Sequence, residues 1–207
     1  QFIYPGCGYG GSCFPKDVRA LEAIALNAGY RPQLLRAVRE VNERQKQRLA
    51  EKVLAYYGKD IRGRTFALWG LAFKPRTDDM REAPSRALLE ALWQAGARVR
   101  AFDPRAMDTC QTLYGERDDL LLLGTKEAAA KGADALIICT EWKGFWAPDF
   151  DLLRTLLRTP VIFDGRNLYD PALLAEQGFD YMAIGRGVDP ERAGVQSRRR
   201  GLPVRAA

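Results

Sequence analysis

The sequence of 207 residues contains no histidine. Within this chain, that absence excludes Ser-His-Asp triads, Cys-His pairs and HExxH zinc sites. The four cysteines are irregularly spaced and include no CxxC pair. This spacing argues against a metal site and a disulfide framework, and it fits the reduced thiols of a cytoplasmic protein. We therefore expect no metal, a cytoplasmic location and a nucleophile, if there is one, that is activated without histidine.

Long apolar segments are also missing. No apolar run approaches the roughly 20 residues that span a bilayer, so we expect no membrane association. The formal net charge is +6, and residues 186–207 hold six arginines against two acidic residues. This composition predicts a disordered basic tail at 187–207, with nucleic-acid binding as a minor alternative. The remainder is only mildly basic, which indicates a site for small anionic molecules and no nucleic-acid-binding face.

Helical periodicity runs through residues 1–60. The chain starts without a methionine, in a glycine-rich loop, and we interpret it as the C-terminal part of a longer protein. Pro15 suits the first turn of a helix, and a second helix of roughly 25 residues is predicted from Gln33 to Gly58. Its apolar stripe consists of Leu34, Leu35, Val38, Val41, Leu49, Val53 and Tyr56. Such a long helix is expected to connect domains, and its stripe either packs in a core or forms a homodimer interface.

Strands and helices alternate over residues 61–186. The predicted strands are residues 65–71, 98–102, 135–139, 161–163 and 181–184, with helices between most of them. This alternation predicts an α/β fold, in which a doubly wound, Rossmann-like parallel sheet follows the all-helical first segment. Ligands of such sheets bind beyond the carboxyl ends of the strands. The loops after Trp69, Phe102, Cys139 and Phe163 are therefore the expected ligand sites.

Four glycines surround two cysteines in residues 6–13, GCGYGGSC. Glycines allow positive φ angles and a close approach of the backbone to a ligand. Cys13 stands just before the helix that Pro15 opens, so the helix dipole and the neighbouring Lys16 would stabilise a thiolate there. Asp17 lies one turn further on and can assist proton transfer from water or a hydroxyl group. Two alternatives stay open: Cys13 is a structural thiol, or Cys7 is the nucleophile.

Cationic side chains follow two of the predicted strands. No GxGxxG fingerprint occurs after the first strand, where residues 70–85 instead contain Lys74, Arg76 and Arg81 ahead of a helix. These residues indicate either an anion site or a solvated charged loop. After the strand at 161–163, the sequence FDGRN contains Arg166, which could bind a ligand, cap a helix or pair with Asp164.

Three segments resemble the UDP-glucose and GDP-mannose dehydrogenase family: GYGGSCFPKD at 8–17, residues 70–85, and FDGRN at 163–167. The resemblance implies an NAD-dependent, two-step oxidation of UDP-glucose to UDP-glucuronate. Cys13 would attack the intermediate aldehyde, and the resulting thiohemiacetal would become a thioester that water hydrolyses. Asp17 would assist the alcohol or water steps, and two NAD would be consumed per sugar.

The resemblance also implies binding residues. Those for the nucleotide-sugar are Phe2, Ile3, Tyr4, Pro5, Gly6, Gly10, Lys74 and Arg166. Lys16 and Arg81 would contact NAD, which the family binds mainly through an N-terminal domain that is missing from this chain. The expected function is therefore part of a nucleotide-sugar 6-dehydrogenase for UDP-glucose, inactive without that domain. The alternatives are GDP-mannose or another nucleotide-sugar as substrate, a non-catalytic nucleotide-sugar binding or dimerisation module, and, less strongly, a redox sensor at Cys13.

Overall fold

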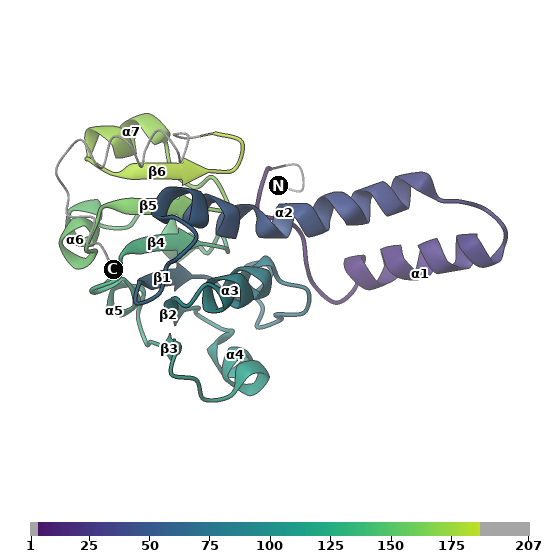
Figure 1. Cartoon of the computed structure of the whole chain (residues 1–207), viewed down its shortest axis with the longest axis horizontal. Coiled ribbons are helices and arrows are strands. Elements are labelled where there is room, and N and C mark those ends of the chain that lie inside the picture. Colours follow the sequence, from purple (N-terminus) through teal and green to yellow (C-terminus); the bar gives the residue numbers. More distant parts are fainter. Residues whose placement is uncertain (1–3, 187–207) are drawn as a thin grey trace.

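The computed structural model of the chain describes residues 4–186. The predicted basic tail at 187–207 and the predicted ligand residues Phe2 and Ile3 lie outside the described residues. Figure 1 shows a hairpin of two helices that projects from a body built around a sheet. Among residues 4–186, no helix is both long enough and apolar enough to cross a membrane.

The projecting hairpin consists of α1 (Phe14–Asn27) and α2 (Gln33–Tyr57). Pro15 lies in the first turn of α1, where a missing N–H leaves no hydrogen bond unmade. Gly58 follows the end of α2 with a φ of +91°, which a residue without a Cβ adopts readily. The second half of α2 packs on the sheet through Leu49 and Val53. The predicted start, end and length of the long helix are confirmed.

The first half of the apolar stripe of α2 does not pack in a core, so that alternative is wrong there, and the homodimer interface stays a prediction. Leu34 and Val41 are 76% and 54% exposed, whereas the polar residues Asn42 and Lys46 are buried. The first half of α2 runs beside α1 and away from the body, so its apolar side chains meet solvent (Figure 1). Nearer the body, polar residues of α2 contact the glycine-rich loop that precedes α1.

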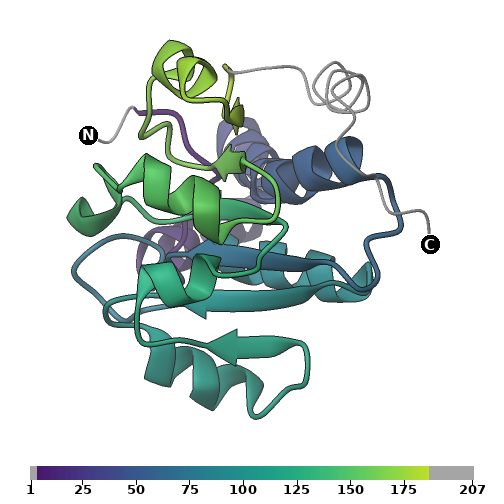
Figure 2. The same cartoon turned by 90° about the vertical axis from the view of Figure 1, so that its left-hand side faces the viewer.

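Within the described part of the chain, six parallel strands form one sheet in the order β3-β2-β1-β4-β5-β6 (Figure 2). Their bounds are β1 (Thr65–Trp69), β2 (Arg98–Phe102), β3 (Leu120–Leu122), β4 (Ala135–Ile138), β5 (Val161–Asp164) and β6 (Asp180–Ala183). β1 pairs with β2 on one side and with β4 on the other, so the direction of winding reverses there. This is the doubly wound order of Rossmann-type sheets, and the predicted fold class is confirmed.

Helices cover both faces of the sheet. They are α3 (Pro84–Gln94), α4 (Met107–Tyr114), α5 (Lys126–Ala130), the 3-10 helix η1 (Lys143–Phe145), α6 (Phe150–Leu156) and α7 (Pro171–Glu176). One core joins α2, α3 and α4 to the sheet, and a second core joins α5, α6 and α7 to its opposite face. Because both faces are covered, every residue of β4 and β5 is buried. A ligand can therefore reach these two strands only at their ends.

Candidate active site

The glycine-rich loop at residues 6–13, called here the cysteine loop, lies against two loops of the sheet. The amide of Cys7 donates a 2.9 Å hydrogen bond to the carbonyl of Gly165, just after β5. The amide of Gly11 donates a 2.7 Å hydrogen bond to the carbonyl of Arg81, between β1 and α3. Both acceptors lie beyond the carboxyl ends of strands, where ligands of doubly wound sheets bind. The three segments expected to carry the site are therefore adjacent in space.

Side-chain amides of α2 hold the cysteine loop from its other side. Asn42 accepts a 2.8 Å hydrogen bond from the amide of Tyr9 and donates a 3.1 Å bond to the carbonyl of the same residue. Gln45 donates a 2.6 Å hydrogen bond to the carbonyl of Gly6. Reasoning from periodicity missed both residues because it assigned polar side chains of α2 to solvent. Their ability to pair with backbone donors and acceptors was the available signal.

Two glycines of the cysteine loop are required by close packing. A Cβ at Gly10 would overlap the carbonyl group of Glu82. Gly11 has a φ of +98°, and a Cβ there would lie 2.7 Å from the ring of Phe73. Both neighbours belong to the loop that connects β1 to α3, so the missing side chains let the two loops come together.

Burial separates the two candidate nucleophiles. Cys7 is fully buried, and its Sγ lies 3.8 Å from the carbonyl oxygen of Cys139. Contact with Cys7, together with burial, raises the pKa of Cys139 well above its ordinary value, so this thiol stays protonated. Cys110 is also buried, and burial raises its pKa to about 11. Cys13 is exposed, which leaves it as the accessible thiol among four free cysteines.

Cys13 lies at the N-terminus of α1, with cations around it. Its Sγ is 3.6 Å from the hydroxyl of Ser12. The hydrogen bond to Asp17 raises the pKa of Lys16, and the negative charge of a Cys13 thiolate adds to this effect. The two hydrogen bonds to Asp79 raise the pKa of Arg81, again with a contribution from Cys13. Lys16 follows Cys13 by three residues on α1, and Arg81 belongs to the loop that the Gly11 hydrogen bond holds against the cysteine loop.

The Lys16–Asp17 pair occupies the exposed side of this helix end. The ammonium of Lys16 lies 2.6 Å from the carboxylate of Asp17, and both side chains are largely exposed. Asp17 is one turn from Cys13, as its spacing predicts, and the amide of Asp17 donates to the carbonyl of Cys13. A substrate would displace water from these groups without breaking a buried contact.

The loop between β1 and α3 differs from a dinucleotide-binding turn. Gly70 has a φ of +93°, but the side chain of Thr140 fills the space beside it. Asp103, at the end of β2, is buried and accepts hydrogen bonds from the amides of Leu71 and Ala72. In a dinucleotide-binding fold these positions contact the pyrophosphate and the ribose. In this chain, the Thr140 side chain fills the space beside Gly70, and Asp103 already accepts hydrogen bonds from the amides of Leu71 and Ala72.

Three exposed cations, Lys74, Arg76 and Arg81, lie on that loop. The ammonium of Lys74 lies 5.2 Å from the centre of the Phe73 ring, the same ring that packs on Gly11. Arg81 is held by Asp79 through Nε at 2.9 Å and Nη2 at 2.8 Å. Both side chains therefore belong to the surface beside the cysteine loop and can meet an anionic ligand.

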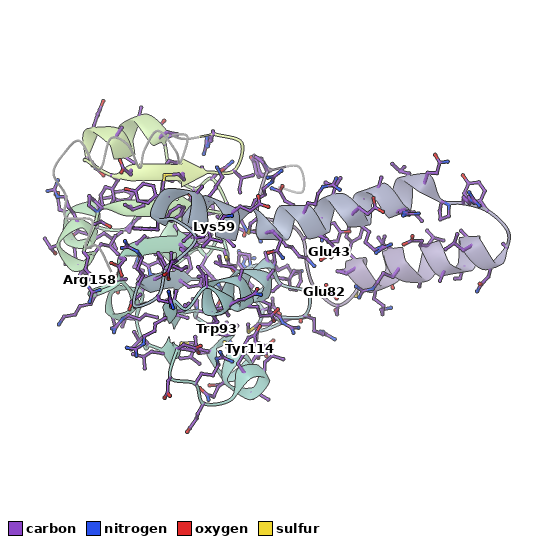
Figure 3. The ribbon with its side chains drawn as sticks, viewed as in Figure 1. Glu43, Lys59, Glu82, Trp93, Tyr114 and Arg158 are labelled. Carbon is purple, nitrogen blue, oxygen red and sulfur yellow. The ribbon has the colours of Figure 1, made fainter. Side chains whose placement is uncertain are left out.

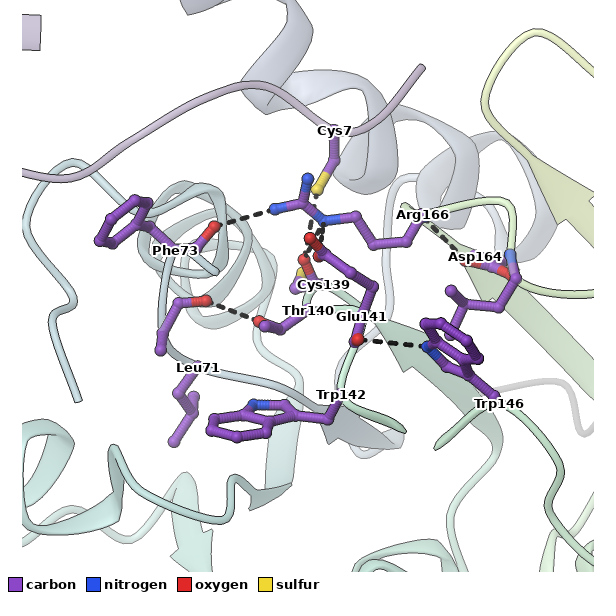
Figure 4. A network of polar contacts seen from close by, with 12 residues as sticks. Cys7, Leu71, Phe73, Cys139, Thr140, Glu141, Trp142, Trp146, Asp164 and Arg166 are labelled. Atoms are coloured by element: carbon purple, nitrogen blue, oxygen red, sulfur yellow. Dashed lines mark hydrogen bonds and ion pairs between the residues drawn. The ribbon is translucent and has the colours of Figure 1, made fainter. Parts of the chain in front are cut away.

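Arg166, in the loop after β5, connects this loop to the loops that follow β1 and β4 (Figure 4). Its Nε donates to the carbonyl of Cys139 at 2.7 Å, and its Nη2 donates to the carbonyl of Phe73 at 3.0 Å. The side chain also forms a 3.1 Å ion pair with Glu141. The Arg166 side chain therefore neither caps a helix nor turns toward Asp164, which instead accepts from the Arg166 backbone amide. Its Nη1 faces Gly6, where a Cβ would lie 3.1 Å away.

The described site residues fall into two groups connected by residues 8–11. Cys13, Lys16 and Asp17 lie at the start of α1, and Arg81 belongs to the loop that the Gly11 hydrogen bond holds against the cysteine loop. Gly6 and Arg166 meet at the carboxyl ends of β4 and β5, and Tyr4 and Pro5, which precede Gly6, are exposed. Gly10 lies against Glu82, and Lys74 lies over the Phe73 ring that packs on Gly11. In residues 4–186, no cluster of three cysteine or acidic side chains is arranged to hold a metal ion. The arrangement can present a thiol and several cations to one anionic ligand.

Family models match most of the described chain. The UDP binding domain of the UDP-glucose/GDP-mannose dehydrogenase family matches residues 67–171, and the central domain of the same family matches residues 1–44. The chain belongs to this family. It is 56% identical over 189 residues to the UDP-glucose 6-dehydrogenase of Pseudomonas aeruginosa. That match covers 90% of the chain and 42% of the relative, so the chain spans less than half the length of such family members.

Solved structures of the family share this fold. A UDP-glucose dehydrogenase from Pyrobaculum islandicum is 32% identical with a TM-score of 0.71, over 87% of this chain and 38% of that one. The NDP-N-acetyl-D-galactosaminuronic acid dehydrogenase of Methanosarcina mazei has a TM-score of 0.76 at 26% identity, over 89% of this chain and 40% of that one. Family membership therefore establishes a nucleotide-sugar dehydrogenase fold, and relatives with this fold are named for different sugars.

Proposed function

We propose that this chain supplies the cysteine nucleophile and the nucleotide-sugar site of an NAD-dependent nucleotide-sugar 6-dehydrogenase, with UDP-glucose as the substrate. The observation that carries the proposal is the exposed thiol of Cys13, held next to the Arg81 loop by the Gly11 hydrogen bond. The 56% identity to the Pseudomonas aeruginosa relative supports UDP-glucose as the sugar.

Cys13 would act on the aldehyde stage of the sugar. Its thiolate adds to the C6 carbonyl carbon, and the carbonyl electron pair moves to oxygen, which takes a proton to give a thiohemiacetal. At the thioester stage, water attacks the carbonyl carbon and the Cys13 thiolate leaves. Asp17 accepts the proton of the attacking water, since its carboxylate lies one turn away on the exposed side of α1. Lys16 and Arg81 stabilise the negative charge of the sulfur.

The diphosphate would bind between the two groups of residues. Lys74 offers an exposed ammonium there, and a charge-assisted bond to phosphate is worth about 1.5–3 kcal/mol. Arg166 reaches the same region through Nη1, because its Nε and Nη2 are used by carbonyl groups. Tyr4, Pro5, Gly6 and Gly10 provide the backbone that wraps the sugar.

NAD, when bound, accepts the hydride in each oxidation. Lys16 and Arg81 fit an anionic cofactor, because both are exposed cations beside Cys13. The turn after β1 does not fit a dinucleotide, since Thr140 fills the space beside Gly70 and Asp103 already accepts a hydrogen bond from the amide of Leu71. The greater length of the relatives agrees with a separate NAD-binding domain, and we expect the 207-residue chain to need one for turnover.

Calorimetry on the 207-residue chain tests the substrate assignment. UDP-glucose is expected to bind, Lys74→Ala to weaken it roughly 10- to 150-fold, and GDP-mannose to bind more weakly. NAD is expected not to bind measurably, and no NADH should form. Stronger binding of GDP-mannose would overturn the choice of sugar, and turnover by the chain alone would overturn the need for another domain.

A second function, a module for pairing two copies of the chain, is favoured by the projecting hairpin. Its exposed apolar side chains are Phe14, Leu21, Ile24, Leu26, Tyr30, Leu34 and Val41. Scattered apolar residues are common on surfaces, but a projecting hairpin with so many indicates an interface. Sedimentation should show a dimer that Ile24→Asp dissociates, and a monomeric wild-type chain would contradict the pairing.

The four free thiols also support the proposed cytoplasmic location.

A further inference from the structure

The carboxylate of Glu82 lies where three elements meet. Its Oε1 is 3.0 Å from Nη1 of Arg19 on α1, and its Oε2 is 3.0 Å from Nζ of Lys46 on α2. Glu82 itself belongs to the loop that runs from β1 to α3. Figure 3 labels Glu82 and, on α2, Glu43 at the place where the hairpin meets the body. One side chain thus connects α1, which follows Cys13, with α2 and the loop of Arg81.

Lys46 makes this contact from a buried position. Only 5% of the residue is exposed, and its methylene chain packs on Gly8, where a Cβ would lie 3.0 Å from Cγ. A buried ammonium needs an anion beside it, because an unpaired charge is costly to desolvate. Glu43 also contacts Lys46, but it lies on the same helix and is mostly exposed. Glu82 is therefore the partner that connects Lys46 to another element.

The backbone of Glu82 is held in an uncommon conformation. Its φ is +53°, in the left-handed region that residues with a Cβ adopt at a cost. That conformation places the Glu82 carbonyl against Gly10 and follows directly on the Arg81 carbonyl, which accepts from Gly11. Two ion pairs on the side chain therefore hold the stretch of backbone on which the cysteine loop rests.

We infer that Glu82 is a positioning residue that keeps the Arg81 loop against the cysteine loop and so places Arg81 near Cys13. The ion pairs with Lys46 and Arg19 hold Glu82 in place. The backbone of Glu82 in turn fixes the position of the preceding residue, Arg81, and the ion pair with Asp79 orients the Arg81 side chain. Arg81 then stabilises a thiolate at Cys13. The inference rests on the proposed role of Cys13 as the nucleophile, and its test reads the reactivity of that thiol without a substrate.

The test is the rate of alkylation of Cys13 by iodoacetamide in the 207-residue chain as a function of pH, with the modified peptide identified by mass spectrometry. Glu82→Gln is expected to slow the reaction about three- to tenfold at neutral pH and to move the half-maximal rate to higher pH. Arg81→Gln should give a similar loss, and the double variant should be no slower than the slower single variant. Glu43→Gln, the matched control, removes a partner of Lys46 without touching the loop and should leave the rate unchanged.

Three results would overturn the inference. One is a Glu82→Gln protein that folds and keeps the wild-type pH profile. Another is additive losses from Glu82→Gln and Arg81→Gln, which would show that the two residues act separately. The third applies if Glu82→Gln does not fold and Glu82→Asp, which retains the charge with a shorter reach, takes its place. Glu82→Asp should lose part of the reactivity, and a rate equal to wild type would contradict the inference. Failure of UDP-glucose to bind would overturn the proposed substrate and leave these thiol rates unaffected.

Discussion

The amide of Gly11 donates a 2.7 Å hydrogen bond to the carbonyl oxygen of Arg81, although the two residues are 70 positions apart. This bond connects the loop that ends at Cys13 to the loop that carries Lys74 and Arg81. The ring of Phe73 covers the same glycine and so closes the contact from a second side. A change at this junction should therefore affect both stability and the surroundings of the thiol.

Gly11→Ala is expected to destabilise the chain more than a comparable change elsewhere. Alanine at a positive φ costs about 1–2 kcal/mol at either of two sites, Gly11 and Gly29. A Cβ at Gly11 also overlaps the Phe73 ring, whereas nothing lies within 4 Å of a Cβ at Gly29. Urea unfolding should therefore show a loss for Gly11→Ala that exceeds the loss for Gly29→Ala by about 1–3 kcal/mol. Equal losses would show that the ring contact contributes nothing.

Alkylation of the native chain is expected to modify Cys13 first. Cys7, Cys110 and Cys139 are buried, so they should react only after unfolding. Peptide mass spectrometry after a short exposure to iodoacetamide checks this order, and Cys13→Ser gives the background. Early modification of Cys7 would reopen the choice of nucleophile.

Arg166→Ala should destabilise the chain by about 2–4 kcal/mol. The substitution leaves the carbonyls of Cys139 and Phe73 without their donor, and it removes the partner of Glu141. Arg36→Ala is a suitable control, because its pair with Glu40 lies on the surface of α2 and should contribute little to stability. Unfolding curves of the three proteins check the difference, and similar losses for both variants would contradict the joining role of Arg166.

The coupling between Lys46 and Glu82 should depend on pH. The hydrogen bond from Lys46 lowers the pKa of Glu82 below its ordinary value of 4.5. The stabilisation is therefore fully present above that value and is lost as the pH falls through the lowered pKa of the folded protein. A double-mutant cycle with Lys46→Met and Glu82→Gln should give about 1–2 kcal/mol at neutral pH and less in acid. A coupling that stays constant in acid would show that the carboxylate charge is not involved.

Much of the fold could be predicted because its signals are local. The buried strands at 135–138 and 161–164 are continuous apolar runs, and the ends of α2 have a proline and a glycine beside them. β3 and α4 were missed. β3 has three residues, too few for periodicity to emerge, and α4 shows few apolar residues on its inner face. β3 lies at the far edge of the sheet from the site, whereas Thr109 and Leu113 of α4 line a pocket together with Asp79 and Arg81.

The site could be predicted only in part, since motifs identify residues and not their partners. The cysteine loop, Lys74, Arg81 and Arg166 have sequence signals of their own. The roles of Asn42, Gln45, Lys46 and Glu82 could not be assigned from the sequence, because they come from tertiary contacts across 33 to 39 positions of chain. A charged residue on a long helix resembles a solvated one until its neighbours are known.

Protection of Cys13 by a nucleotide-sugar tests the central claim most directly, namely that the thiol and the nucleotide-sugar site are one site in this chain. Alkylation of Cys13 is measured against increasing UDP-glucose, with Lys74→Ala as the control that weakens the diphosphate contact. We predict saturable slowing in the wild-type chain and little slowing in Lys74→Ala at the same concentrations. Binding of UDP-glucose by calorimetry together with an unchanged alkylation rate would contradict the claim.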